Sequence, residues 1–133
     1  MYLLDTCVIS DFVKGEPNTL SKIKSCLPGE LFMSSITVME IEFGLLKNPQ
    51  KALKIEPVLK EFIEAITILD FGEEEAKKAG FIRLSLTQSG IPIGPYDFLI
   101  GATALAKDLT LITSNIGEFQ RIEALKIQNW RDV

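Results

Sequence analysis

The sequence has no histidine among its 133 residues. This absence excludes imidazole as a general acid, a general base or a metal ligand. Any catalysis by this chain must therefore rely on carboxylates, hydroxyls, lysines or a thiol. Cysteine is also scarce: Cys7 and Cys26 form no Cys-x-x-Cys pair, so the sequence contains no zinc site of the usual cysteine and histidine type.

Long hydrophobic runs are missing as well. No apolar stretch approaches the roughly 20 residues that a membrane-spanning helix needs, although hydrophobic residues make up 47% of the chain. The first residues, Met1 to Asp5, include no basic side chain and end on a charge, so they do not resemble a secretory signal. We therefore expect a cytoplasmic protein without membrane contact, whose two cysteines stay reduced.

The length and charge of the chain are those of an ordinary globular domain. The length predicts a single domain, residues 1–133. The net charge of −4 argues against non-specific adhesion to nucleic acid, although it leaves room for a locally basic groove.

What the sequence does contain is an alternation of short apolar runs with longer helical patterns. In residues 93–118, Gly94 and Pro95 open a helix that is apolar on nearly all sides, and a turn then leads to a strand. The expected strands are 1–4, 31–34, 65–69, 109–113 and, at an edge, 125–128. The expected helices are one capped by Thr6 and running to Val13, one from Asn18 or Thr19 to Leu27, one from Thr37 to Leu45, Gln50–Glu64, Glu73–Ser89 and Pro95–Ala106. This alternation predicts an α/β fold with a small, mostly parallel sheet and helices on both faces.

Acidic and polar residues stand where this fold brings chain segments together. Asp5 follows the first strand, Glu40 lies in the first turn of the helix after the second strand, and Asp97 lies in the first turn of the 95–106 helix. Asn115 and Glu118 follow the strand into which that helix leads. Because strand carboxyl ends and helix N-termini share one edge of an α/β sheet, these groups are expected to converge.

Each acid also has an ordinary structural explanation. Thr37 and Glu40 fit a capping box. Asp97 suits the first turn of a helix, and Asp5 can pair with the neighbouring Thr6 or a lysine. These explanations are weaker for the group as a whole, because clustered carboxylates beside apolar segments are costly unless a cation holds them. Oxygen ligands suit Mg²⁺ or Mn²⁺, and such a site fits metal-assisted hydrolysis of phosphodiesters.

Five segments of the sequence form an ordered set, which is more specific than any one of them alone. They are Tyr2-Leu3-Leu4-Asp5-Thr6, Ser34 to Gly44, Ile93 to Ala106, Leu111 to Asn115 with Glu118 and Phe119, and the closing Asn129-Trp130. Together they resemble the PIN domain, and within it the VapC toxin ribonucleases of prokaryotic toxin–antitoxin pairs. The resemblance covers almost the whole chain.

The resemblance implies a function and a set of site residues. It implies an endoribonuclease that depends on Mg²⁺ or Mn²⁺, with Asp5, Glu40 and Asp97 as the metal-binding acids. It also implies an RNA substrate, a homodimer and a cognate VapB-type antitoxin whose tail fills the site.

Two positions depart from the family pattern. The family usually has Asn after Asp-Thr, where this chain has Cys7, and its fourth acid, often Asp, is here Asn115. Glu118 is the candidate to replace that acid, with Thr6, Thr113 and Asn115 as supporting residues. Without a histidine to activate its thiol, Cys7 is expected to be a buried structural residue.

Two other functions compete with the nuclease. Asn115 in place of an acid fits a non-catalytic PIN-like module that binds RNA or a partner through a degenerate site. A receiver-like phosphotransfer domain also gathers Asp at strand ends, but it needs paired acids after the first strand and a lysine after the last, and this chain has neither.

Overall fold

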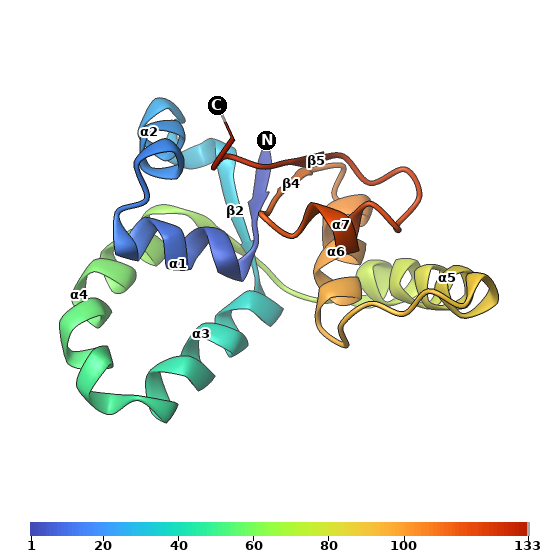
Figure 1. The fold of residues 1–133 in the computed structure, drawn as a ribbon, viewed down its shortest axis with the longest axis horizontal. Helices are drawn as coiled ribbons and strands as arrows, with labels where there is room; N and C mark the ends of the chain where they lie inside the picture. Colours follow the sequence, from blue (N-terminus) through green and yellow to red (C-terminus); the bar gives the residue numbers. More distant parts are fainter. Residues whose placement is uncertain (133) are drawn as a thin grey trace.

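The computed structural model describes residues 1–132, and within them a five-stranded parallel sheet forms the centre, in the order β3-β2-β1-β4-β5. The strands are β1 (Tyr2–Leu4), β2 (Leu31–Ser34), β3 (Thr67–Leu69), β4 (Thr110–Ile112) and β5 (Ile127–Gln128). The helices are α1 (Thr6–Lys14), α2 (Pro17–Ser25), the 3-10 turn η1 (Pro28–Glu30), α3 (Ser35–Lys47), α4 (Pro49–Ala65), α5 (Glu73–Ser89), α6 (Asp97–Ala106) and α7 (Ile116–Phe119). The predicted α/β fold is confirmed, with α1, α2 and α4 on one side and α5, α6 and α7 on the other (Figure 1).

Alternate residues of the strands form two separate cores. Leu3 of β1 and Leu111 of β4 pack with the buried side chains of α5, α6 and α7. Leu4 and Ile112, each one residue later, pack with those of α1, α2 and α4. All four are completely buried. The two-residue period of the strands therefore covers both faces of the sheet, as expected for short apolar parallel strands.

The strand order changes direction between β1 and β4. From β1 the chain builds outward through β2 to β3, and then crosses back to β4 and β5 on the other side of β1. The register pairs Leu4 with Ile112, and the Asp5 backbone N–H donates to the Ile112 carbonyl at 3.0 Å. Asp5 and Thr113 therefore leave the sheet side by side, at the point where an open α/β sheet forms its binding crevice.

Two helices that flank this point begin at other residues than predicted. Thr6 does not cap α1: Asp5 is the cap, its side chain accepts the Thr6 N–H, and Thr6 is the first helical residue. The 95–106 helix begins at Asp97 instead of Pro95, because Pro95 and Tyr96 form a turn. The apolar pattern shows that a helix exists, but it does not show which side chain reaches the free N–H groups at its start.

The second and third helices also differ from prediction. α2 runs from Pro17 to Ser25, so Leu27, the predicted end of this helix, lies beyond it and is 71% exposed. Ser34 caps α3, so Glu40 lies in the second turn and not the first. The alternative capping box between Thr37 and Glu40 does not form, because Glu40 contacts Thr6 instead.

Other elements follow the prediction closely. β2 and α5 have the predicted bounds, and β3, β4 and β5 lie within the predicted ranges but are shorter. Three acids, Glu73 to Glu75, occupy the first turn of α5, where they suit the positive end of the helix dipole. Within residues 1–132, no helix combines the length and the hydrophobicity needed to cross a bilayer.

Candidate metal and active site

Asp5 lies at the centre of the site, where β1 meets α1, and its side chain is buried. Its Oδ1 accepts the backbone N–H of Thr6 at 2.7 Å, and its Oδ2 accepts the Thr113 hydroxyl at 2.8 Å. Burial raises the pKa of Asp5 above its ordinary value, while these hydrogen bonds oppose the rise. Both carboxylate oxygens therefore have fixed directions.

Glu40 reaches the same place from α3. Its Oε1 accepts the Thr6 hydroxyl at 2.7 Å, across a separation of 34 residues in the chain. Thr6 therefore contacts both acids, because its backbone N–H holds Asp5 and its side chain holds Glu40. The neighbouring Glu42 is exposed on the outer face of the helix.

Asp97, the first residue of α6, faces the other carboxylates and is half-buried. Its pKa is raised to about 7, first by burial and then by the negative charges of Asp5, Glu118 and Glu40. The raised pKa of this carboxyl group reflects its burial first and the neighbouring negative charges second. The structure thus brings together the four acids predicted from the sequence.

Glu118, on α7, is held from two sides. The Gly94 backbone N–H donates to its Oε1, and Asn115 Nδ2 donates to its Oε2 at 2.7 Å. These hydrogen bonds hold the pKa of Glu118 below its ordinary value. The Asn115 side chain therefore orients Glu118 through its amide donor.

Gly94 is a site residue whose role the sequence did not reveal. A Cβ atom at this position would lie 3.1 Å from Asp97 Oδ2 and 3.3 Å from Glu118 Oε1. The absence of a side chain therefore lets both carboxylates approach the backbone. A glycine three residues before a candidate metal ligand was the available signal, but it predicted only the start of a helix.

Cys7 makes a polar contact with Asp5 where the family pattern has Asn. Its Sγ lies 3.4 Å from Asp5 Oδ2 and 3.5 Å from Thr113 Oγ1, and it accepts the Ser114 N–H at 3.4 Å. Burial, and then the charge of Asp5, raise the pKa of the Cys7 thiol. The thiol is partly buried and packs against the core formed with α1, α2 and α4, and it also makes these polar contacts with the site.

The donor set suits a hard divalent cation. Four carboxylates come from the end of β1, from α3, α6 and α7, and burial together with the charges of the other three raises the pKa of Asp97. In this arrangement no three His, Cys, Asp or Glu side chains of residues 1–132 are placed to hold a metal ion. The oxygens instead accept the hydrogen bonds described above. Carboxylate oxygens with such excess negative charge are the ligands that Mg²⁺ and Mn²⁺ prefer.

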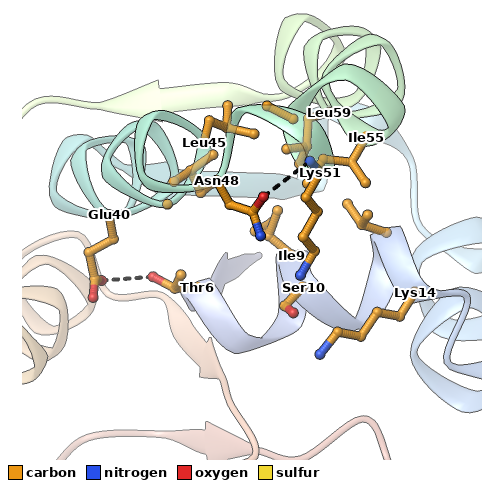
Figure 2. A pocket seen from close by; sticks show the side chains of 14 residues that line it. Thr6, Ile9, Ser10, Lys14, Glu40, Leu45, Asn48, Lys51, Ile55 and Leu59 are labelled. Carbon is orange, nitrogen blue, oxygen red and sulfur yellow. Dashed lines mark hydrogen bonds between the residues drawn. The ribbon is translucent and has the colours of Figure 1, made fainter.

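An apolar groove of about 200 Å³ leads away from the acidic site (Figure 2). Thr6 and Glu40 stand at one end, and Lys14 stands at the other. The groove runs between α1, α3 and α4, and its apolar lining includes Ile9, Val13, Ile41, Leu45, Ile55 and Leu59. Its charged side chains are Glu40 at one end, Lys14 at the other and Lys51 between them (Figure 2).

The sequence comparisons agree with the fold. The family model described as "PIN domain" matches residues 2–125. The tRNA(fMet)-specific endonuclease VapC of Salmonella typhimurium is 32% identical over 131 residues, covering 97% of each chain. Ribonuclease VapC2 of Haemophilus influenzae is 33% identical over 129 residues, again covering 97% of each.

Solved structures have the same architecture. VapBC2 from Rickettsia felis, bound to a DNA fragment from its promoter, matches with a TM-score of 0.89 and 30% identity, over 97% of this chain and 98% of that chain. FitAcB from Neisseria gonorrhoeae matches with a TM-score of 0.87 and 28% identity over the full length of both chains. The chain therefore belongs to the PIN-domain family. Its full-length relatives are VapC ribonucleases, and the resemblance drawn from the sequence is confirmed.

Proposed function

We propose that this chain is a divalent-metal-dependent endoribonuclease, the toxin of a cytoplasmic toxin–antitoxin pair, built as a single domain. The observation that carries the proposal is the convergence of four carboxylates at the strand-order switch, where the pKa of Asp97 is raised to about 7. The VapC relatives support RNA as the substrate, since two of them are named as an endonuclease specific for a transfer RNA and as a ribonuclease.

The residues have separate roles in this proposal. Asp5, Glu40 and Asp97 hold Mg²⁺ or Mn²⁺, and Glu118 adds the fourth negative charge. The bound ion supplies an activated water and stabilises the charge that develops on the phosphate. Thr113 orients Asp5, and Thr6 orients Glu40, through the hydrogen bonds already described. Asn115 and the Gly94 N–H hold Glu118 ionised beside the site.

The test is cleavage of single-stranded RNA by pure protein with and without Mn²⁺. Asp5→Asn and Asp97→Asn should reduce cleavage to the level of a no-enzyme control, because each removes a charged ligand. Their melting temperatures without metal should stay the same or rise, because each also relieves repulsion. Glu42→Gln is the matched control, since this exposed acid lies two residues from Glu40 and outside the site. If the wild-type protein binds RNA but never cleaves it at any metal concentration, the non-catalytic module is the better explanation.

We also propose that the apolar groove binds a segment of the cognate antitoxin. Two relatives were solved as VapBC assemblies on DNA, from Rickettsia felis and Salmonella typhimurium. The groove suits a segment with apolar side chains along its length, a cation near Glu40 and acidic residues near Lys14 and Lys51. The probe is the protein encoded by the adjacent small gene. Ile55→Asp should weaken its binding strongly, whereas Leu84→Asp, an exposed position on α5 across the sheet, should not.

A homodimer is the remaining part of the proposal. The α3–α4 pair exposes several large apolar side chains, among them Phe43, Leu46 and Leu53, which are 63%, 77% and 80% exposed. Apolar surface of this kind usually marks an interface. We propose that a second copy of the chain covers it.

A further inference from the structure

Cys7 stands in the first turn of α1, and its thiol joins two parts of the site. On one side Sγ lies 3.4 Å from Asp5 Oδ2, and on the other it accepts the backbone N–H of Ser114 at 3.4 Å. Ser114 belongs to the loop that leads from β4 to Asn115 and Glu118. We propose that Cys7 is a positioning residue, whose thiol, by holding Oδ2, fixes the orientation of the Asp5 carboxylate for binding the divalent cation. This inference rests on the proposed metal site.

The direction of each proton in this cluster follows from the partners. Thr113 has one hydroxyl proton, and it donates that proton to Asp5 Oδ2 at 2.8 Å. Thr113 Oγ1 can therefore only accept from its other neighbours, the Asn115 N–H at 3.0 Å and Cys7 at 3.5 Å. The Cys7 S–H proton must then point toward Asp5 Oδ2 and Thr113 Oγ1, while the sulfur accepts from Ser114. A thiol can do both, since it is a weak donor and a weak acceptor.

The arrangement gives Asp5 two side-chain donors on one oxygen, and they come from different elements. Thr113 holds Oδ2 from the end of β4, and Cys7 holds it from α1. Removing the thiol leaves Thr113 alone and also frees the Ser114 N–H. Groups that orient metal ligands typically contribute 10- to 100-fold to affinity. Because sulfur donates weakly, we expect an effect of about tenfold.

The experiment measures Mn²⁺ binding directly, by the electron paramagnetic resonance signal of free Mn²⁺, so that it does not depend on cleavage. Cys7→Ala should raise the dissociation constant about tenfold, with an unchanged circular dichroism spectrum. Cys7→Ser should restore most of the affinity, because a hydroxyl keeps the donor and the acceptor. Cys26→Ser is the matched control, since this second free thiol packs against the same α1, α2 and α4 core as Cys7 but follows α2, away from the acids. Asp5→Asn is the reference for loss of a ligand.

The outcomes separate this inference from the proposed function. If Asp5→Asn weakens Mn²⁺ binding but Cys7→Ala matches the wild type, the metal site stands and the role of Cys7 is refuted. If Cys7→Ala and Cys7→Ser weaken Mn²⁺ binding equally, the thiol acts through its size and not through its hydrogen bonds, and the proposed positioning role is refuted. If Cys7→Ala does not fold, Cys7→Val replaces it, because valine is similar in size to cysteine but has no donor. The difference in Mn²⁺ affinity between Cys7→Val and Cys7→Ser then tests the role of the hydrogen bond. If the wild-type protein binds no Mn²⁺, the proposed metal site and this inference fail together.

Discussion

Gly94→Ala tests whether the site depends on close approach of carboxylates to the backbone. The added Cβ would lie 3.1 Å from Asp97 Oδ2 and 3.3 Å from Glu118 Oε1, which is closer than ordinary van der Waals contact by a few tenths of an ångström. The backbone at Gly94 does not have a positive φ, so alanine fits it without conformational strain. The two side chains must therefore shift, and the shift falls on the acids that the proposed metal site uses.

The expected result is a loss of function without a loss of stability. Gly→Ala at a compatible position stabilises a protein by about 0.4–1 kcal/mol, because the unfolded chain has fewer conformations. Misplacing a catalytic group by about 1 Å costs about 100-fold in rate, so a shift of a few tenths of an ångström should cost roughly threefold to tenfold. The Mn²⁺ concentration for half-maximal cleavage should rise as well, because Asp97 and Glu118 both move.

The assay is RNA cleavage against Mn²⁺ concentration, with thermal unfolding measured on the same samples. Gly117→Ala is the control, because Gly117 precedes Glu118 on α7 and a Cβ there meets no atom within 4 Å. A Gly94→Ala protein with wild-type cleavage at every metal concentration would refute the reasoning. A large fall in melting temperature would also refute it, since Gly94 would then serve the fold and not the site.

Four further predictions follow from the same geometry. Without metal, the free energy of unfolding should fall as pH rises from about 4 to about 7, because the pKa of Asp97 is about 7 in the folded protein and 3.8 in the unfolded chain. The shift sets a ceiling of about 4 kcal/mol on this loss, which solvent around the half-buried group reduces. In urea unfolding with EDTA, the difference in stability between pH 5 and pH 8 should be smaller for Asp97→Asn than for the wild type. Glu118→Gln and Asn115→Ala should each raise the Mn²⁺ concentration needed for half-maximal cleavage. The double variant should need no more Mn²⁺ than Glu118→Gln alone, because Asn115 acts by holding Glu118 at 2.7 Å. Additive losses in a metal titration would contradict this. Arg131→Ala should lower stability by about 1–3 kcal/mol in chemical unfolding and leave Mn²⁺ affinity unchanged, because it strands the buried Asp11 carboxylate that Arg131 binds through two hydrogen bonds of 2.6 and 2.7 Å. Light scattering at micromolar concentration should give a dimer for the wild type and for Leu84→Glu, and a monomer for Phe43→Glu; a monomeric wild type would argue against the proposed α3–α4 interface.

The sequence by itself determined the fold class and indicated which acids come together. Short apolar runs that alternate with helical patterns are a local property, so the five strands and the full extent of α5 could be read from residue order alone. Asp5, Glu40, Asp97 and Glu118 stand next to strand ends and helix starts, and a parallel sheet must bring those ends to one edge. The PIN-domain motifs are readable for the same reason, since each is a short contiguous segment.

Only the tertiary structure decided which groups touch those acids. Thr113 meets Asp5 across 108 residues, because β1 lies beside β4 in the sheet. Gly94 meets Glu118 across 24 residues, because α6 and α7 contact each other. No local pattern encodes these pairs, since a hydrogen bond between distant residues depends on strand order and register. The same reason explains why Cys7, expected to be structural, lies between Asp5 and Ser114. Periodicity determines what each segment becomes, and the order of the strands determines which side chains meet at its end.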